Sequence, residues 1–117
     1  MGYKPTVIFD FDGVIHSYTS GWKGADRIPD KPVHGIQEAI NHIRDHYKVV
    51  VVSTRCYQTG GIDAINEWLN KYDIFVDDVT AEKPPAHVQI DDRAITFTGD
   101  TEGLLNTIQE FRPWNHS

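Results

Sequence analysis

The chain has 117 residues, which is enough for one domain with a hydrophobic core and too few for two. Its apolar content of 39% and charged content of 24% are ordinary for a globular protein, and its net charge of -6 argues against non-specific nucleic-acid binding through a broad basic face. The sequence shows no signal-peptide core and no apolar run of membrane-spanning length, and its single cysteine, Cys56, has no partner for an internal disulfide. These features predict one cytoplasmic domain over residues 1–117.

The first hydrophobic stretch of the chain ends in two carboxylates. Residues 6–9 are apolar or β-branched and too few for a helix, so they predict a strand that is buried on both faces. Asp10 follows at the carboxyl end of this strand, and Gly13 allows a tight turn that brings Asp12 back over the same point. Two acids placed so close are costly unless they hold a cation or carry out chemistry. For this motif alone, an ordinary Asp/Gly turn remains the alternative.

Segments with strand and helix patterns alternate along the rest of the chain. Residues 17–32 are rich in glycine, polar and aromatic residues, and they predict a surface loop, a flap over 16–33 rather than a cap domain. Apolar spacing predicts helices over residues 33–47, 62–72 and 101–111, the last with Leu104, Leu105, Ile108 and Phe111 facing inward. The other predicted strands cover residues 48–53, 74–76, 87–90 and 94–97.

This alternation predicts an α/β fold of the three-layer, Rossmann-like kind. Its sheet is expected to be mainly parallel and five-stranded, with the first strand central and helices on its faces. The carboxyl ends of parallel strands converge on one edge of such a sheet. Asp10, Ser53, Lys83 and the pair Asp91-Asp92 all lie at or just beyond predicted strand ends, so we expect them to meet there.

These residue types supply the parts that phosphomonoester hydrolysis needs. Asp10 is the candidate nucleophile, which forms an aspartyl-phosphate that water then hydrolyses, and Asp12 is the candidate acid/base. Ser53 offers a hydroxyl and Lys83 a compact cation to the phosphoryl oxygens. Mg²⁺ neutralises phosphoryl charge and prefers oxygen ligands. The candidate ligands for Mg²⁺ are Asp10, Asp12, Asp91 and Asp92.

The order of these motifs resembles that of the haloacid dehalogenase-like superfamily of phosphohydrolases, over essentially the whole chain. The residues that carry the resemblance are the Asp-x-Asp-Gly of 10–13, then Ser53, then Lys83, and last the acidic pair Asp91-Asp92. The resemblance implies that Asp10 attacks phosphorus and that the backbone carbonyl of Asp12 also binds magnesium. The short connections resemble the cap-less members, which often act on large substrates or have their sites covered by a partner subunit. Lys83 stands closer to Asp91 than is usual in the family.

Two shorter stretches bear on the substrate. Ser53-Thr54-Arg55 and Asp91-Asp92-Arg93 are similar to stretches in the 3′-phosphatase domains of polynucleotide kinases. This similarity implies a nucleotide or a 3′-phosphorylated nucleic acid end as substrate, and arginine suits bidentate contact with phosphate. Arg55 and Arg93 as plain surface charges are the alternative. The residues expected to contact phosphate or substrate are Gly13, Thr54, Arg55 and Arg93, and Thr54 is also a rival to Ser53.

Several residues near the motifs keep two interpretations. Asp77-Asp78 is a second acidic pair after a predicted strand, and we interpret it as a turn. His16 either reaches the site or begins the following loop. Tyr18 and Trp22 either stack on a base or pack the loop onto the body of the domain, and packing is the favoured interpretation.

The order of the motifs distinguishes three classes of function. The leading hypothesis is a magnesium-dependent phosphatase that acts through an aspartyl-phosphate. A phosphorylation-dependent receiver places its acidic pair after the first strand and its phospho-acceptor near mid-chain, where this sequence has Ser53, so that class fits poorly. A non-catalytic phosphate- or magnesium-binding or scaffold protein that retains the fold predicts the loss of a motif residue, and no motif residue is plainly lost.

Overall fold

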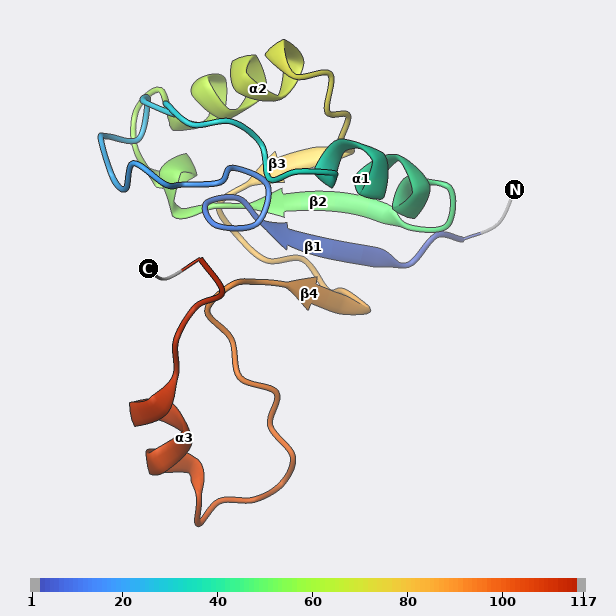
Figure 1. The fold of residues 1–117 in the computed structure, drawn as a ribbon. Helices are drawn as coiled ribbons and strands as arrows, with labels where there is room; N and C mark the ends of the chain where they lie inside the picture. Colours follow the sequence, from blue (N-terminus) through green and yellow to red (C-terminus); the bar gives the residue numbers. More distant parts are fainter. Residues whose placement is uncertain (1–2, 116–117) are drawn as a thin grey trace.

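The computed structural model describes residues 3–115 (Figure 1). It is an α/β domain with a four-stranded, all-parallel sheet and three α-helices. The strands are β1 (Thr6–Asp10), β2 (Lys48–Val52), β3 (Asp78–Thr80) and β4 (Val88–Ile90). The α-helices are α1 (Ile36–Arg44), α2 (Gly61–Lys71) and α3 (Leu104–Glu110), and a short 3₁₀ helix, Thr54–Tyr57, follows β2.

The strand order is β3-β2-β1-β4, so the first strand of the chain is an inner strand, as predicted. In the β1–β2 pair Asp10 is level with Val52, and in the β1–β4 pair Phe9 is level with Ile90. The carboxyl ends of β1, β2 and β4 therefore lie at one edge of the sheet. Residues that directly follow these three strands become neighbours in space.

The core lies between one face of the sheet and the helices α1 and α2. Alternate residues of β1 and β2 point toward this face, as the two-residue period of a strand requires. They pack against buried side chains of both helices, and Figure 1 shows the two helices over the same side of the sheet. The residues that form this layer are Val7, Phe9, Val49, Val51, Ile40, Ile65, Trp68 and Leu69.

The predicted strand over residues 74–76 is wrong, because the third strand forms over Asp78–Thr80 instead. After α2, Asp73 adopts a left-handed backbone (φ 55°) and turns Ile74 into the core, where it is 3% exposed. Asp77 then takes the place next to β2: its backbone N–H donates to the carbonyl of Val49 and its Oδ2 accepts from the N–H of Val49. Pairing with β2 starts only at Asp78, so the pair 77–78 is not the simple turn we expected.

The C-terminal part of the chain also differs from the prediction. Residues 94–97 form no strand, and α3 has no buried residue. Leu105 and Ile108 are 66% and 56% exposed, so they do not face inward as predicted. Figure 1 shows α3 on an arm that leaves the sheet beyond β4, with α1 and α2 on the sheet's other side. The five strands and the third layer of the prediction are therefore not seen in residues 3–115.

The helices in the described part of the chain are short. None combines the length and the apolar character that a membrane-spanning helix needs.

Candidate active site

A pocket of about 680 Å³ opens at the carboxyl edge of the sheet. It brings together residues that follow β1, β2, β3 and β4. Of the residues singled out in the sequence, its wall contains Asp10, Asp12, Ser53, Thr54, Lys83, Asp91, Asp92 and Arg93. Gly13 and Arg55 are not part of this wall. The convergence predicted from strand ends is thus observed for most of the candidate residues.

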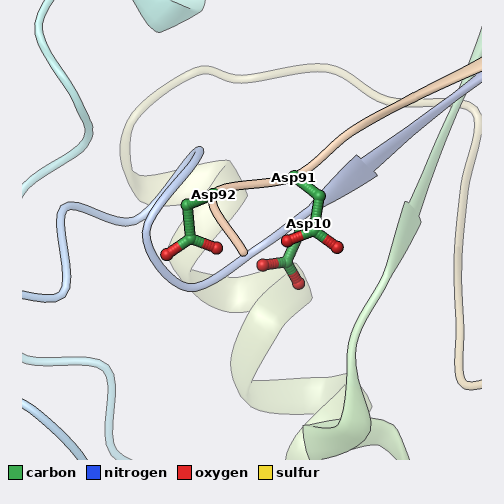
Figure 2. A group of neighbouring side chains, drawn as sticks. All are labelled: Asp10, Asp91 and Asp92. Carbon is green, nitrogen blue, oxygen red and sulfur yellow. The ribbon is translucent and has the colours of Figure 1, made fainter. Parts of the chain in front are cut away.

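Three carboxylates meet at the end of β1, as Figure 2 shows. Asp10, Asp91 and Asp92 each contribute one carboxylate oxygen to a group whose members all lie within 4.8 Å of one another. Asp91 is oriented from two sides: Gln89 Nε2 donates to its Oδ2 at 2.9 Å, and the backbone N–H of Arg93 donates to its Oδ1 at 2.9 Å. Gln89 precedes Asp91 by two residues, so the strand places both on one side. Gln89 was not among the site residues predicted from the sequence.

The electrostatics of this cluster fit a cation. Burial, a hydrogen bond with Asp92 and the charges of Asp91 and Asp92 raise the pKa of Asp10 to about 8, despite an opposing hydrogen bond from the backbone of Phe11. In the described residues, Asp92 Oδ1 is buried without a hydrogen-bond partner. Carboxylates that crowd and desolvate one another in this way are relieved by a bound cation, and a set made only of oxygens suits Mg²⁺. Asp10, Asp91 and Asp92 therefore fit a magnesium ion.

Gly13 lies against this cluster and is a requirement of its geometry. Its φ of 86° is in the left-handed region, and a Cβ built on it would overlap the carboxylate of Asp92. The turn is closed by the Gly13 N–H, which donates to the carbonyl of His16 at 2.8 Å. Gly13 is buried and outside the pocket wall, so the structure gives it a packing position, and its expected contact with phosphate or substrate stays a prediction.

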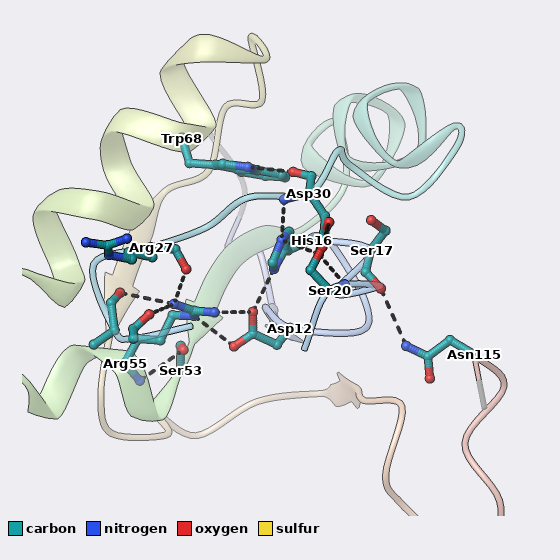
Figure 3. A network of polar contacts seen from close by, with 12 residues as sticks. Asp12, His16, Ser17, Ser20, Arg27, Asp30, Ser53, Arg55, Trp68 and Asn115 are labelled. Carbon is teal, nitrogen blue, oxygen red and sulfur yellow. Dashed lines mark hydrogen bonds and ion pairs between the residues drawn. The ribbon is translucent and has the colours of Figure 1, made fainter. Parts of the chain in front are cut away.

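Asp12 is held by a network of polar contacts, shown in Figure 3. Arg55 donates from Nε to Asp12 Oδ2 at 2.8 Å and from Nη2 to Oδ1 at 3.1 Å. His16 Nδ1 lies 2.8 Å from Oδ1. Burial by itself raises the pKa of Asp12, but the hydrogen bonds and charges of His16 and Arg55 outweigh it and lower that pKa below its usual value. The Asp12 side chain is thus outside the three-carboxylate cluster.

Arg55 is neither an exposed phosphate ligand nor a surface charge. Its side chain is fully buried. Beyond its two bonds to Asp12, its Nη1 donates to the carbonyls of Gly24, Ala25 and Arg27 at 2.7, 3.1 and 3.1 Å. The guanidinium is buried behind two residues of the pocket wall, Asp12 and Trp22, and does not itself line the pocket. In this structure Arg55 therefore has internal partners, and it offers no exposed face for the expected contact with phosphate.

His16, which sequence analysis left open, is a fully buried link between Asp12 and the 17–32 loop. Its Nε2 accepts from the backbone N–H of Asp30 at 3.1 Å. The carboxylate of Asp30 accepts from the N–H and hydroxyl of Ser20, and its carbonyl accepts from Trp68 Nε1 on α2. The loop predicted as a flap is therefore tied to the body at several points. The spacing of four residues from Asp12 was the available sequence signal for His16.

The remaining predicted residues lie on the pocket wall. Ser53 is 5% exposed, and its Oγ accepts from the N–H of Arg55 at 3.2 Å, which starts the 3₁₀ helix. Thr54 is exposed beside it, so both candidate hydroxyl groups lie at the pocket. Lys83 and Arg93 are exposed on the same wall, and within residues 3–115 neither forms an ion pair. Two cationic side chains are therefore available to an anion in this pocket.

Aromatic side chains form another part of the wall. Trp22 and Tyr57 are 49% and 67% exposed, and Tyr18 also lines the pocket. The ring of Trp22 covers the guanidinium carbon of Arg55 at 4.7 Å, while Tyr18 packs edge-on against His16. Tyr18 and Trp22 thus pack on the body, as the favoured interpretation expects, and both also line the pocket, where stacking on a base stays a prediction. Tyr57, at the end of the 3₁₀ helix, was not among the residues predicted from the sequence.

Comparisons with protein-family models, with curated proteins and with solved structures gave no significant match. The class of the site therefore follows from its own geometry. It is a cluster of three carboxylates on strand ends, with a fixed fourth carboxylate and two unpaired cationic side chains of the described chain beside it.

Proposed function

We propose that this protein is a magnesium-dependent phosphatase that hydrolyses a phosphomonoester through an aspartyl-phosphate on Asp10, in the manner of the haloacid dehalogenase-like superfamily. The observation that carries the proposal is the meeting of Asp10, Asp91 and Asp92 at the carboxyl end of β1, with Asp12 fixed beside them. A phosphorylation-dependent receiver would not need a carboxylate such as that of Asp12 held beside the cluster for proton transfer.

Asp10, Asp91 and Asp92 would hold the magnesium ion. When bound, the ion supplies the positive charge that keeps the crowded carboxylates ionised and offsets the charge of the phosphoryl group. The buried, unpartnered Oδ1 of Asp92 and the raised pKa of Asp10 support a cation at this point.

In the first step, a carboxylate oxygen of Asp10 attacks phosphorus, and the bond between phosphorus and the ester oxygen breaks. The electron pair leaves with that oxygen, which takes a proton from Asp12 when Asp12 is protonated. In the second step, a water oxygen attacks phosphorus while Asp12 takes its proton. The bond between phosphorus and Asp10 breaks, inorganic phosphate leaves, and Asp12 carries a proton for the next turnover.

The lowered pKa of Asp12 determines which leaving groups react most readily in this scheme. Asp12 is ionised in the resting site and is ready to accept a proton from water. A leaving group that departs as an anion, such as an aryl oxide, reacts without a proton from Asp12. Alkyl esters, including sugar phosphates and nucleotides, require the protonated form. An aryl phosphate is therefore the most sensitive first substrate.

The pocket wall supports a substrate with a base. Lys83 and Arg93 are exposed on this wall, and we expect them to bind phosphoryl oxygens together with the hydroxyl groups of Ser53 and Thr54. Trp22 and Tyr57 present exposed rings to the same pocket, and aromatic rings bind nucleobases by stacking. The substrate class that best fits both features is a nucleotide or a 3′-phosphorylated nucleic acid end.

The test is phosphate release from a panel of phosphomonoesters, with and without Mg²⁺. The panel holds an aryl phosphate, sugar phosphates, mononucleotides, and oligonucleotides phosphorylated at the 3′ or the 5′ end. Magnesium-dependent release is expected, with a loss of at least about 10³-fold in Asp10→Asn, because a nucleophile acts as a unit with its partners. Asp63→Asn changes an exposed carboxylate of α2 outside the pocket wall and is expected to keep full activity.

The same experiment decides the alternative. A folded protein that binds Mg²⁺ and inorganic phosphate but releases no phosphate from any member of the panel would be a non-catalytic phosphate-binding protein. Activity that persists without divalent cations, or in Asp10→Asn, would contradict the proposed mechanism.

A further inference from the structure

We propose that Arg55 is a positioning residue: it fixes the carboxylate of Asp12 at the pocket by joining it to the backbone of the 17–32 loop, and it does not bind the substrate phosphate. This inference rests on the proposed function, because proton transfer by Asp12 is the step that would need the positioning. It also makes the loop a fixed strap and excludes a lid that opens and closes with each turnover.

The contact between Arg55 and Asp12 has the geometry of a paired fork. Two nitrogens of the guanidinium, Nε and Nη2, meet the two oxygens of the carboxylate at 2.8 and 3.1 Å. Such a bidentate pair fixes both the position and the plane of the carboxylate. Lysine presents a single point charge on a flexible stem, so it cannot reproduce this restraint.

The other side of the guanidinium is anchored to the strap. Nη1 donates to three carbonyls of residues 24–27, the Ala25 side chain beside them is buried, and the ring of Trp22 covers the guanidinium carbon. Turning Arg55 toward the pocket would break five hydrogen bonds in a buried position. A buried polar group left without its partner destabilises the protein, so the inward orientation persists when phosphate enters.

His16 restrains Asp12 from a second direction. Its Nε2 accepts from the backbone N–H of Asp30, so in the neutral ring the proton lies on Nδ1 and is donated to Asp12 Oδ1. The carboxylate therefore has donors on two sides, both anchored to the same strap. Rotation of Asp12 away from the pocket would break contacts with Arg55 and His16 together.

The first test compares Arg55→Lys with the wild type on one substrate of the panel in Mg²⁺. The control is Arg44→Lys, which changes an arginine ion-paired with Asp77 outside the pocket wall. We expect Arg55→Lys to lower kcat at least about tenfold, with KM and the inhibition constant of inorganic phosphate within about twofold of the wild type. A tenfold rise in KM and in that inhibition constant, with kcat kept, would overturn the proposal and make Arg55 a phosphate ligand.

The second test is chemical rescue of Arg55→Ala. Truncation leaves a buried space bordered by the Asp12 carboxylate and three carbonyls, which suits a guanidinium ion. Guanidinium at low millimolar concentration is expected to restore kcat at least about fivefold without raising the melting temperature, whereas ethylammonium at the same concentration is not. Equal rescue by both ions, or by neither while the melting temperature stays at the wild-type value, would contradict positioning by a guanidinium.

A third test uses the wild-type protein and does not depend on activity or on the folding of a variant. Hydrogen exchange of the backbone amides of residues 17–32 is measured with Mg²⁺ alone and with Mg²⁺ and inorganic phosphate. A fixed strap predicts exchange rates that agree within about twofold, whereas protection by tenfold or more would show a lid and overturn the proposal. This measurement needs no turnover. An inactive wild-type protein would refute the proposed function, but the exchange rates would still show whether residues 17–32 form a fixed strap or a lid.

Discussion

Gly13 lies so close to Asp92 that the two residues leave no room for a side chain between them. One residue belongs to the turn after β1 and the other follows β4, so this contact is where the first and last strands of the sheet meet beyond their ends. The glycine of the Asp-x-Asp-Gly stretch thus serves two needs. It accepts a left-handed backbone, and it lets a carboxylate approach the backbone of the turn.

Gly13→Ala is therefore expected to displace Asp92 as well as strain the turn. The strain alone costs about 1–2 kcal/mol in unfolding free energy, because a Cβ is disfavoured at this φ. Displacement of Asp92 should in addition remove most of the stabilisation by Mg²⁺. Gly35→Ala is the control, since Gly35 has a similar φ of 80° and open space around its Cβ position. Denaturant unfolding with and without Mg²⁺ measures both effects, and an equal response to Mg²⁺ in the two variants would contradict this account.

The pH dependence of magnesium binding follows from Asp10. Its folded pKa of about 8 lies above its usual value of 3.8, so in the absence of metal this group stabilises the folded state below pH 3.8 and that contribution is lost as pH rises toward 8. Mg²⁺ must displace the proton, so its affinity should rise through the same range. We expect the shift in melting temperature caused by a fixed Mg²⁺ concentration to grow from pH 6 to pH 8. A constant or falling shift would mean that Asp10 is not a ligand.

Asp92→Asn distinguishes two effects of the acidic cluster on stability: repulsion between its carboxylates without metal, and stabilisation by bound Mg²⁺. Without metal at pH 8 to 9, removing one of three crowded charges should raise the unfolding free energy by about 1 kcal/mol. In Mg²⁺ the order should reverse, because a cation bound at 100 times its dissociation constant contributes about 2.7 kcal/mol to a site that keeps its ligands. The control is Asp45→Asn at the exposed end of α1. A variant that is destabilised equally in both conditions would contradict a metal-binding role.

The aromatic part of the wall predicts how substrates are distinguished. Base stacking is worth about 1–3 kcal/mol per base, so Tyr57→Ala should raise KM for a mononucleotide or a 3′-phosphorylated oligonucleotide by about 5- to 150-fold. KM for a sugar phosphate should stay within about twofold. Tyr57 is the better choice for this test than Trp22, because Trp22 also covers Arg55. Equal effects on sugar phosphates and nucleotides would refute stacking in this pocket.

Asp77 predicts a defect in stability rather than in activity. Its Oδ2 accepts from the N–H of Val49 at 2.7 Å and its Oδ1 accepts from Arg44 at 3.1 Å. Asp77→Ala leaves the N–H of a core strand without a partner, so a loss of about 1–3 kcal/mol in unfolding free energy is expected. Asp45→Ala should stay within about 0.5 kcal/mol of the wild type. Denaturant unfolding tests both variants, and a neutral Asp77→Ala would show that water replaces the carboxylate at Val49.

The parts of the fold that the sequence predicts well are those in which local pattern and burial agree. β1 and β2 are runs of apolar residues flanked by polar ones, and α1 and α2 have apolar faces that do pack on the sheet. Ile74-Phe75-Val76 has the same apolar character, but the turn at Asp73 directs Ile74 into the core as a single buried residue after α2. The apolar pattern of a short segment does not distinguish a loop that buries one residue in the core from a strand that pairs in the sheet.

The residues of the candidate site also differ in how well the sequence predicts them. The residues that directly follow strands were correctly predicted to lie together, because the ends of parallel strands converge whatever the conformation of the loops. Arg55 was expected to face the substrate, since an arginine next to a hydroxyl residue looks the same in the sequence whether it points outward or inward. Its direction is set by the carbonyls of residues 24–27, which lie in a loop without periodic pattern. The C-terminal helix was predicted for its apolar spacing, and that spacing carries no information on whether α3 reaches the sheet.

The pairing of β1 with β4 also has a consequence for the order in which the molecule is assembled. Phe9 is level with Ile90, so the second partner of the strand that carries Asp10 lies about 80 residues further along the chain. β1, β2 and β3 can associate through shorter closures while Asp91 and Asp92 are still distant. Any partly folded species that lacks β4 therefore lacks two of the three carboxylates, and in a refolding experiment the appearance of magnesium affinity would mark the closing event of folding.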